Sequence, residues 1–416
     1  MKTEIFDYGM NGEGVGKIDN KIVLLPNALI GEIVEFDLVK EYSNYAIGSV
    51  KNVENCSKQR LEPPCPYYYE CGGCDLQHMA SLEQAKFKKM LVQKTIKKIT
   101  GNSVEVEDTI TSNKHFEYRN KMSFNIKNNE VGFYKNNSKD LVKIQKCLLC
   151  NQKINEILFI FNKFLQKNNK FIKNLVIRDI NNQILVGVVV SADLDLNPFY
   201  TELKNRFENV GVYQILNTRK DSVVLSGKVS HVAGIKEIKI ENFGLHYSVD
   251  LMGFHQTNID IQNKIYSKVL EMIDNNSVVL NGFSGQGLLS AIVAQKAKKV
   301  YGIEINKNSH ISAEKLKKDN RISNLTNICG DFYKEFDKIK EKINTIILDP
   351  TKKGCGKQAM CAIMGVENII YISCNPIALS KDLREILNDY KIETIIPFDM
   401  FPNTKNVETL VKLKLK

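Results

Sequence analysis

Asn368-Ile-Ile-Tyr-Ile-Ser-Cys-Asn-Pro-Ile-Ala-Leu-Ser-Lys-Asp-Leu383 joins a strand pattern to a helix pattern. Its first six residues carry no charge and are mostly β-branched or aromatic, which predicts a short buried strand. From Ala378 to Tyr390 the apolar residues recur at helical spacing. Pro376 prevents the strand from continuing. The stretch therefore predicts an α/β unit with Cys374 at the carboxyl end of a strand, where open α/β sheets bind ligands.

Two interpretations of Cys374 follow from this position. A thiol that faces a ligand crevice is a candidate nucleophile. A free cysteine is also among the most commonly buried residue types, so Cys374 is equally consistent with a small core side chain. The spacing by itself favours neither interpretation.

From about residue 250 the chain alternates regularly between strand and helix patterns. A predicted strand at 277–281 leads through the glycine turn Gly282-Phe-Ser-Gly-Gln-Gly287 into a helix at 288–297, and a second strand at 300–304 ends on Glu304. This order is typical of a nucleotide-binding βαβ unit, with an acid about 20 residues after the turn to hold a ribose hydroxyl. The glycine spacing is not that of the dinucleotide fingerprint, which argues against NAD.

The glycine turn, Glu304, Gly330-Asp331 and Asp349-Pro350 together resemble the S-adenosylmethionine site of a class I Rossmann-like methyltransferase. That resemblance implies that Glu304 binds the ribose and that Phe283 packs beside the cofactor. Asp349 follows a predicted strand at 345–348 and is expected beside Cys374. A simple Asx turn is the alternative explanation of Asp349.

Composition indicates a large globular protein with a polyanionic partner. The 416 residues suggest two to four domains. The net charge of +11, from 58 basic and 47 acidic residues, favours nucleic acid, although genomic base composition is an alternative source of the many Lys and Asn residues. No apolar run reaches the ~18 residues of a membrane helix, and the N-terminus has no secretory pattern, so we expect a cytoplasmic protein without a membrane partner. No obligate protein partner is inferred.

Residues 1–55 carry four short strand patterns separated by Gly, Asn and Pro. A closed five-stranded, OB-like barrel of this size often binds oligonucleotides, and a barrel without ligand fits the pattern equally well. Through Gly12-Glu-Gly-Val-Gly16 and Ala28-Leu-Ile-Gly-Glu-Ile-Val34 the segment resembles a TRAM domain, which is an RNA-binding barrel.

The stretch Cys65-Pro-Tyr-Tyr-Tyr-Glu-Cys71-Gly-Gly-Cys74 places three thiols in one compact loop. Such clusters in a large intracellular chain indicate a metal site more often than disulfides. Either Cys147 or Cys150 can supply a fourth thiolate, and the set suits zinc or an iron–sulfur cluster. Cys56 lies outside the loop and receives no role.

A basic amphipathic helix is predicted at 82–99, with the possibility that it packs on the C-terminal domain. Arg119 and Lys121 open the next strand pattern and are candidate phosphate ligands, or simple surface charges. Strands and helices then alternate to residue 249 without a readable catalytic constellation. The expected domains are thus 1–55, 56–249 and 250–416.

These motifs together resemble the RNA uracil-5-methyltransferases, and most closely the 23S ribosomal RNA enzymes that carry a TRAM domain and an iron–sulfur cluster. The resemblance covers essentially the whole chain. It rests on the cysteine loop and on six further motifs: Phe254-His-Gln256-Thr-Asn258, Phe283-Ser-Gly285-Gln-Gly287, Gly302-Ile-Glu304, Asp349-Pro350, Ser373-Cys374-Asn-Pro and Asp399-Met-Phe-Pro…Val407-Glu408.

The resemblance implies a fold and a set of site residues. The fold is a multidomain α/β protein with an N-terminal TRAM barrel, a central iron–sulfur α/β domain and a C-terminal methyltransferase domain. Cys374 is the implied nucleophile and Glu408 the general base. The implied ligands of a [4Fe–4S] cluster are Cys65, Cys71, Cys74 and Cys147, and those of S-adenosylmethionine are Gln256, Phe283, Glu304, Asp331 and Asp349.

Three positions depart from the family pattern: Asn281 replaces an acid before the glycine turn, Asn406 replaces a histidine two residues before the base, and Lys352 replaces an arginine. The leading interpretation is methylation of a uridine at C5 in 23S ribosomal RNA. One alternative is a transfer RNA uracil-5-methyltransferase, which the resemblance disfavours because typical members lack the TRAM-like barrel and the cysteine loop. The other is a catalytically weakened RNA-binding module.

Overall fold

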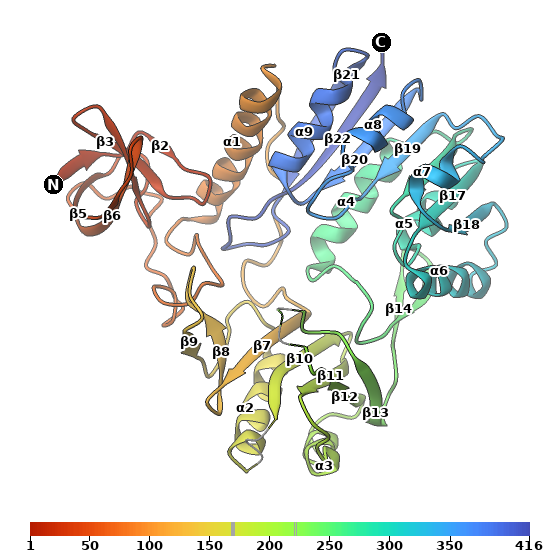
Figure 1. The fold of residues 1–416 in the computed structure, drawn as a ribbon, viewed down its shortest axis with the longest axis horizontal. Coiled ribbons are helices and arrows are strands. Elements are labelled where there is room, and N and C mark those ends of the chain that lie inside the picture. Colours follow the sequence, from red (N-terminus) through yellow and green to blue (C-terminus); the bar gives the residue numbers. More distant parts are fainter. Residues whose placement is uncertain (168–170, 220, 222) are drawn as a thin grey trace.

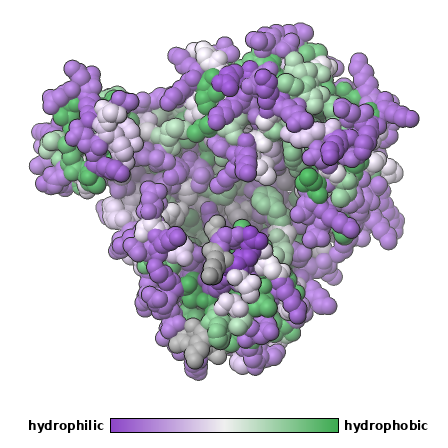
Figure 2. Space-filling view, viewed as in Figure 1, coloured by the Kyte–Doolittle hydropathy of each residue, from purple (hydrophilic) through white to green (hydrophobic). Residues whose placement is uncertain are grey.

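The computed structural model describes residues 1–167, 171–219, 221 and 223–416, and these residues form an N-terminal barrel, a central sheet and a C-terminal sheet (Figure 1). Figure 2 shows a largely hydrophilic face that is hollowed where the three parts meet. Among the described residues no helix is long and apolar enough to cross a membrane.

The N-terminal sheet has six strands in the order β1-β5-β6-β4-β3-β2. Their bounds are β1 Lys2–Glu4, β2 Asp7–Tyr8, β3 Gly14–Ile18, β4 Lys21–Leu25, β5 Ile33–Glu41 and β6 Tyr45–Val53. The four longer strands lie where the sequence predicts them. The expectation of five strands is wrong, because Ile5 and Phe6 divide the first segment into two strands too short to show alternation. A small apolar core that includes Ile5, Val34 and Phe36 fills the interior.

Helix α1 (Ser81–Thr100) follows the cysteine loop and packs against α9 (Pro376–Ile386) and β21 (Tyr390–Phe398) of the C-terminal domain. Its Val92 and Ile96 belong to the same buried cluster as Leu379 and Leu383 of α9. Gly101 ends the helix in the left-handed conformation, with φ of 78°. The helix therefore belongs spatially to the C-terminal domain.

The central sheet has the order β13-β12-β11-β10-β7-β8-β9, and only β11 and β12 are parallel. Its strands are β7 Lys121–Lys127, β8 Glu130–Tyr134, β9 Leu141–Lys143, β10 Ile172–Ile180, β11 Gln183–Val190, β12 Val210–Leu216 and β13 Lys228–Gly234. Helices α2 (Gln152–Lys167) and α3 (Asn197–Lys204) share a buried apolar cluster with the sheet.

A hairpin of β14 (Ile238–Asn242) and β15 (Leu245–Val249) connects the central sheet to the C-terminal domain. Its buried residues join the apolar cluster of the C-terminal domain, and Asn320 exchanges two hydrogen bonds with the backbone of His246. The hairpin thus packs with the C-terminal domain, although it precedes the boundary expected at residue 250.

The C-terminal sheet has the order β18-β17-β16-β19-β20-β22-β21, with β16 to β20 parallel and β22 antiparallel to both its neighbours. Its strands are β16 Val278–Gly282, β17 Lys299–Glu304, β18 Leu325–Cys329, β19 Thr345–Leu348, β20 Asn368–Ser373, β21 and β22 Glu408–Leu415. Both faces are covered, as the uninterrupted apolar strands predict.

Two layers of helices cover this sheet. One layer consists of α4 (Ile259–Glu271), α5 (Leu288–Ala294) and α6 (Lys307–Asp319), and the other of α1, α7 (Phe332–Phe336), α8 (Lys357–Ala362) and α9. Strand β20 has the bounds expected from the sequence. Helix α9 ends at Ile386, earlier than the pattern to Tyr390 suggests, because Tyr390 starts β21 and donates a hydrogen bond to the Val366 carbonyl oxygen at 2.8 Å.

Candidate active site

Three titratable side chains meet at the carboxyl edge of the C-terminal sheet. Asp349 directly follows β19 and Cys374 directly follows β20. Glu408 begins β22, which runs antiparallel beside β20 with Ser373 opposite Thr409. All three residues line one pocket of about 640 Å³. The sheet topology therefore brings together a thiol and two carboxyl groups that are up to 59 residues apart in sequence.

The turn around Cys374 is fixed by the start of α9. The Asn375 side chain accepts a hydrogen bond from the Ile377 backbone N–H at 3.1 Å and caps the helix, with Pro376 in its first turn. The Ser373 hydroxyl accepts a hydrogen bond from the Asn375 backbone N–H at 3.2 Å. Cys374 is thereby held at the amino end of a helix and at the wall of the pocket.

Burial dominates the protonation states in this pocket. The pKa of Cys374 is raised to about 11, mainly by burial and also by the nearby Glu408 and Asp349, whereas Lys352 opposes the rise. Burial also raises the pKa of Glu408 to about 8 and that of Asp349 to about 7. Carboxyl groups with such values are poised to exchange protons near neutral pH.

Lys352 lies on a loop that the α9 segment holds at two points. The Asn375 side chain donates a hydrogen bond to the Lys352 carbonyl oxygen at 2.9 Å. Asp382 accepts hydrogen bonds from the backbone N–H groups of Cys355 and Gly356, at 2.7 and 3.0 Å. Gly354 has φ of 80°, and a Cβ at this position would lie 2.6 Å from Asp382. These contacts fix the loop that brings Lys352 to the pocket.

The glycine turn after β16 is linked to Glu304. One carboxylate oxygen of Glu304 accepts a hydrogen bond from the Gly285 N–H at 2.9 Å, and the other accepts one from the Asn306 N–H at 2.6 Å. Phe283 has φ of 63° and stacks on Phe332 with ring centroids 5.3 Å apart. The Asp331 side chain caps α7. Three of the five predicted cofactor ligands line the pocket: Gln256, Phe283 and Asp349. Glu304 and Asp331 are not among its lining residues.

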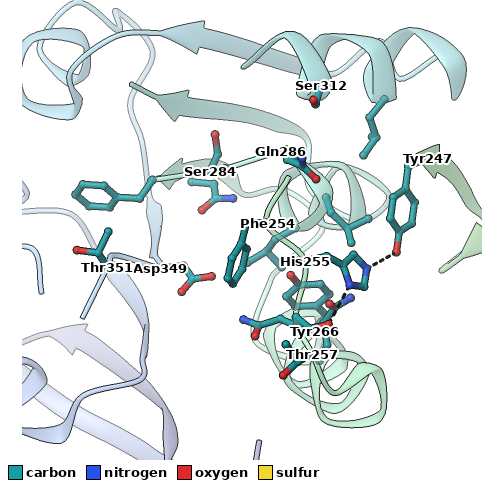
Figure 3. A pocket seen from close by; sticks show the side chains of 18 of the residues that line it. Tyr247, Phe254, His255, Thr257, Tyr266, Ser284, Gln286, Ser312, Asp349 and Thr351 are labelled. Atoms are coloured by element: carbon teal, nitrogen blue, oxygen red, sulfur yellow. Dashed lines mark hydrogen bonds between the residues drawn. The ribbon is translucent and has the colours of Figure 1, made fainter. Parts of the chain in front are cut away.

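His255 and Tyr247 form a pair that the sequence did not reveal, and His255 also contacts the backbone of Gln256. Nε2 of His255 lies 3.2 Å from the Tyr247 hydroxyl, and Nδ1 lies 3.0 Å from the Gln256 carbonyl oxygen. In the view of Figure 3, Phe254 stands between Asp349 and this His255–Tyr247 pair. Burial lowers the pKa of His255 to about 4, so the ring is neutral, donates to Gln256 and accepts from Tyr247. Tyr247 comes from the hairpin, and no spacing in the sequence connects it to Gln256.

The comparisons with known proteins agree with this architecture. Residues 80–416 match the tRNA (uracil-5-)-methyltransferase family, and residues 4–51 match the TRAM domain. An uncharacterized RNA methyltransferase of Clostridium tetani is 33% identical, over 98% of this chain and 94% of that protein. A protein of Clostridium acetobutylicum with the same description is 31% identical, over 99% and 96%.

The chain belongs to the tRNA (uracil-5-)-methyltransferase family. As a member of this family it is an S-adenosylmethionine-dependent RNA methyltransferase. The fold agrees with that of the Pyrococcus abyssi tRNA (uracil-54, C5)-methyltransferase, solved with S-adenosyl-L-homocysteine, with a TM-score of 0.81 and 23% identity over 99% of both chains.

The two predicted phosphate ligands of this methyltransferase have different surroundings. Arg119 lines the pocket and lies over the Phe401 ring, 5.5 Å from its centroid. Lys121 donates a hydrogen bond to the Leu251 carbonyl oxygen at 3.1 Å, and burial and the adjacent Arg178 lower its pKa to about 7. The structure therefore brings Arg119 to the site and directs Lys121 toward the chain segment before Phe254.

The thiols of the cysteine loop lie near one another and near Cys147. Burial, with a smaller contribution from Cys147, raises the pKa of Cys71 to about 11 and that of Cys74 to about 12. A hydrogen bond with Cys150 lowers the pKa of Cys147, while Cys150 lies in the apolar core of the central domain. Among the described residues no group of three or more metal-binding side chains is placed to hold a metal ion. The expected iron–sulfur domain is thus not confirmed by the fold.

Proposed function

We propose that this methyltransferase modifies C5 of a uridine in 23S ribosomal RNA by covalent catalysis. The observation that carries the proposal is the meeting of Cys374, Asp349 and Glu408 in one pocket beside the glycine turn of a methyltransferase fold. C5 of uracil is too weak a nucleophile to attack a sulfonium methyl group directly. A thiol and a carboxylate in one pocket can overcome this limitation, the thiol by adding to the ring and the carboxylate by removing a proton.

In the proposed reaction the Cys374 thiolate adds to C6 of the uracil and makes the ring an enolate. S-adenosylmethionine bound in the pocket would supply the methyl group to C5 and would leave as S-adenosylhomocysteine. Glu408 removes the C5 proton, the bond between C6 and the cysteine sulfur breaks, and the thiolate leaves. The raised pKa of Glu408 suits it to accept this proton, and Lys352 offsets the negative charge around Cys374.

We assign S-adenosylmethionine to the pocket beside the glycine turn, with Gln256, Phe283 and Asp349 in its lining, Glu304 at the end of β17 and Asp331 just after the neighbouring β18. The His255–Tyr247 pair orients the backbone of Gln256. The Asn281 side chain donates a hydrogen bond to the Ser290 hydroxyl at 2.8 Å and so holds the start of α5 beside the glycine turn. This local bond supports the turn even though the usual acid is absent.

We also assign a [4Fe–4S] cluster to Cys65, Cys71, Cys74 and Cys147. Each of the three loop thiols interacts electrostatically with Cys147, which makes this set a four-thiolate donor set. A [4Fe–4S] cluster is held by four cysteine thiolates, the number that this set supplies. The cluster would be structural, because the reaction transfers no electrons.

Transfer RNA is the second candidate substrate. The sequence argument against it was that typical transfer RNA members lack the barrel and the cysteine loop. The Pyrococcus abyssi transfer RNA enzyme, however, aligns over 99% of both chains, so the domain plan does not separate the two substrates. The net charge of +11 and the TRAM domain favour RNA without distinguishing its kind.

Methyl transfer to defined RNAs tests the proposal. Purified protein is incubated with labelled S-adenosylmethionine and either unmodified 23S ribosomal RNA or unmodified transfer RNA, and 5-methyluridine is measured by mass spectrometry. We expect the label in 23S RNA, with full activity of the control Cys361→Ser, because Cys361 is exposed and does not line the pocket. Label in transfer RNA alone establishes the second candidate. No label, with cofactor bound, supports a catalytically weakened binding module.

A further inference from the structure

The segment that carries the proposed base is held by parts of the chain outside the methyltransferase sheet. Residues 399–407, here called the base loop, connect β21 to Glu408. Phe401 and Asn406 of this loop line the pocket. The loop contains Asn403 in the left-handed conformation, with φ of 67°. Its path therefore depends on contacts that stabilise an uncommon backbone geometry.

The cysteine loop provides the first set of contacts. The backbone N–H groups of Asp75 and Leu76, which follow Cys74, both donate to the Asn403 carbonyl oxygen at 3.0 Å. The Asp75 carboxylate accepts a hydrogen bond from the Lys405 N–H at 3.2 Å, and its other oxygen lies 3.6 Å from the Lys405 ammonium group. Two residues of the base loop are thus tied directly to the end of the cysteine loop.

Helix α1 provides the second set. The Gln84 side chain accepts a hydrogen bond from the Asn403 N–H at 2.8 Å and donates one to the Asn403 side-chain oxygen at 3.1 Å. The same Gln84 amide donates to the carbonyl oxygens of Leu76 and Met79. One turn later Lys88 forms a buried ion pair with Asp399 and donates to the Phe401 carbonyl oxygen at 3.1 Å.

These contacts converge on Asn403. Its backbone N–H, carbonyl oxygen and side-chain oxygen bind Gln84 or the cysteine loop, and its side-chain amide donates to the His115 carbonyl oxygen at 2.7 Å. Gln84 and Asn403 are each 3% exposed, so water cannot readily replace a lost partner. Gln84 joins the cysteine loop and the base loop through one side chain.

We propose that Gln84 and Asp75 are positioning residues for Glu408, and that the cysteine loop acts in the reaction by holding the base loop in register with the pocket. This inference rests on the proposed function of Glu408. It explains how a thiolate-bound centre can support a reaction without electron transfer: the folded cysteine loop fixes the path of residues 399–407. Removal of these contacts should impair proton abstraction and leave the preceding steps intact.

The two halves of the reaction can be measured separately. With 5-fluorouridine RNA the reaction stops after methyl transfer, because fluorine cannot leave C5 as a proton, so the rate of adduct formation reports the steps before Glu408 acts. Turnover on ordinary RNA also requires Glu408. The variants are Gln84→Met, which keeps the approximate side-chain volume and removes the amide that bonds to Asn403, and Asp75→Ala. The control is Asp108→Ala, which removes the exposed ion pair between Asp108 and Lys89 of α1.

For Gln84→Met we expect at least a tenfold loss of turnover on ordinary RNA, unchanged affinity for S-adenosylmethionine and unchanged adduct formation with 5-fluorouridine RNA. Hydrogen exchange at residues 400–407 should increase in both variants and remain unchanged in the control. Equal loss in adduct formation and turnover would show a merely structural role and overturn the inference, as would unchanged turnover in both variants. Failure of the proposed function itself is distinguishable, because the wild-type protein would then form no adduct.

Discussion

The Asn375 side chain, one residue after Cys374, donates a hydrogen bond to the Lys352 carbonyl oxygen at 2.9 Å. The turn that presents the thiol therefore also holds the residue whose ammonium group lowers the pKa of Cys374. In Lys352→Met this cation is lost, so the pKa of Cys374 should rise and the rate near neutral pH should fall about tenfold for each unit of the rise. Lys352→Arg keeps the charge and should stay within a few-fold of wild type.

The pH dependence of adduct formation with 5-fluorouridine RNA measures this effect. The neighbouring Lys353→Met is the matched control, since Lys353 is exposed on the same loop and is not part of the pocket lining. Identical pH profiles for wild type and Lys352→Met would contradict the assigned role.

Glu408→Gln removes the proposed base and keeps the shape of the side chain. Addition and methyl transfer should proceed, but the C5 proton should remain, so a methylated covalent complex should accumulate with ordinary RNA. We expect a loss of turnover of at least 100-fold, within the range typical of general base removal. A denaturing gel with labelled cofactor detects the complex. Free methylated RNA released at the wild-type rate would identify another base.

Burial of Glu408 also predicts a dependence of stability on pH. Its pKa is raised from 4.5 to about 8, so between these values the folded protein retains a proton that the unfolded chain releases. Stability therefore decreases as pH rises through this window, and Glu408→Gln, which does not titrate, should raise the melting temperature by several degrees at pH above 8 and little near pH 4.5.

Glu393→Gln provides a control of opposite sign, because Lys412 lowers the pKa of Glu393 through a hydrogen bond. Its ionised form stabilises the folded protein above the unfolded pKa, so the variant should melt slightly earlier at high pH. Thermal melts across the pH range test both. A Glu408→Gln curve parallel to wild type would show that Glu408 is not buried as a protonated acid.

The assignment of the cysteine loop predicts the metal content of single variants. Anaerobically purified protein should contain iron and inorganic sulfide, and Cys71→Ser or Cys147→Ser should lose them. Cys56→Ser should retain them, because Cys56 is exposed and outside the four-thiolate set. Zinc in place of iron, or an intact cluster in Cys71→Ser, would contradict the assignment. Cys150→Ser tests the other candidate fourth ligand, and this variant should retain its iron and sulfide if Cys147 is the ligand.

The sequence predicted local features of the C-terminal domain because the chemistry there follows the ends of uninterrupted apolar strands. Strand β20, the turn at Cys374 and the placement of Asp349 all depend on neighbouring residues, and the structure has them where they are expected. Arg119 and Lys121 were predicted together as candidate phosphate ligands or surface charges, because alternation along a strand does not reveal that Lys121 is directed to the Leu251 carbonyl oxygen.

Long-range contacts account for what the sequence did not reveal. Glu408 would be a surface residue by its local pattern, and only the insertion of β22 between β20 and β21 buries it. The His255–Tyr247 pair depends on a hairpin that precedes the expected domain boundary. Gln84 and Asn403 are separated by 319 positions, so their contact has no local signature.

Trapping the covalent intermediate tests the central claim most directly. The protein is incubated with S-adenosylmethionine and 5-fluorouridine-substituted 23S ribosomal RNA and then run on a denaturing gel. We predict a protein–RNA band that is present in wild type and Cys361→Ser and absent in Cys374→Ala. A band that persists in Cys374→Ala would contradict the assignment of the nucleophile. The absence of a band in wild-type protein that binds the cofactor and methylates this RNA would contradict the covalent mechanism.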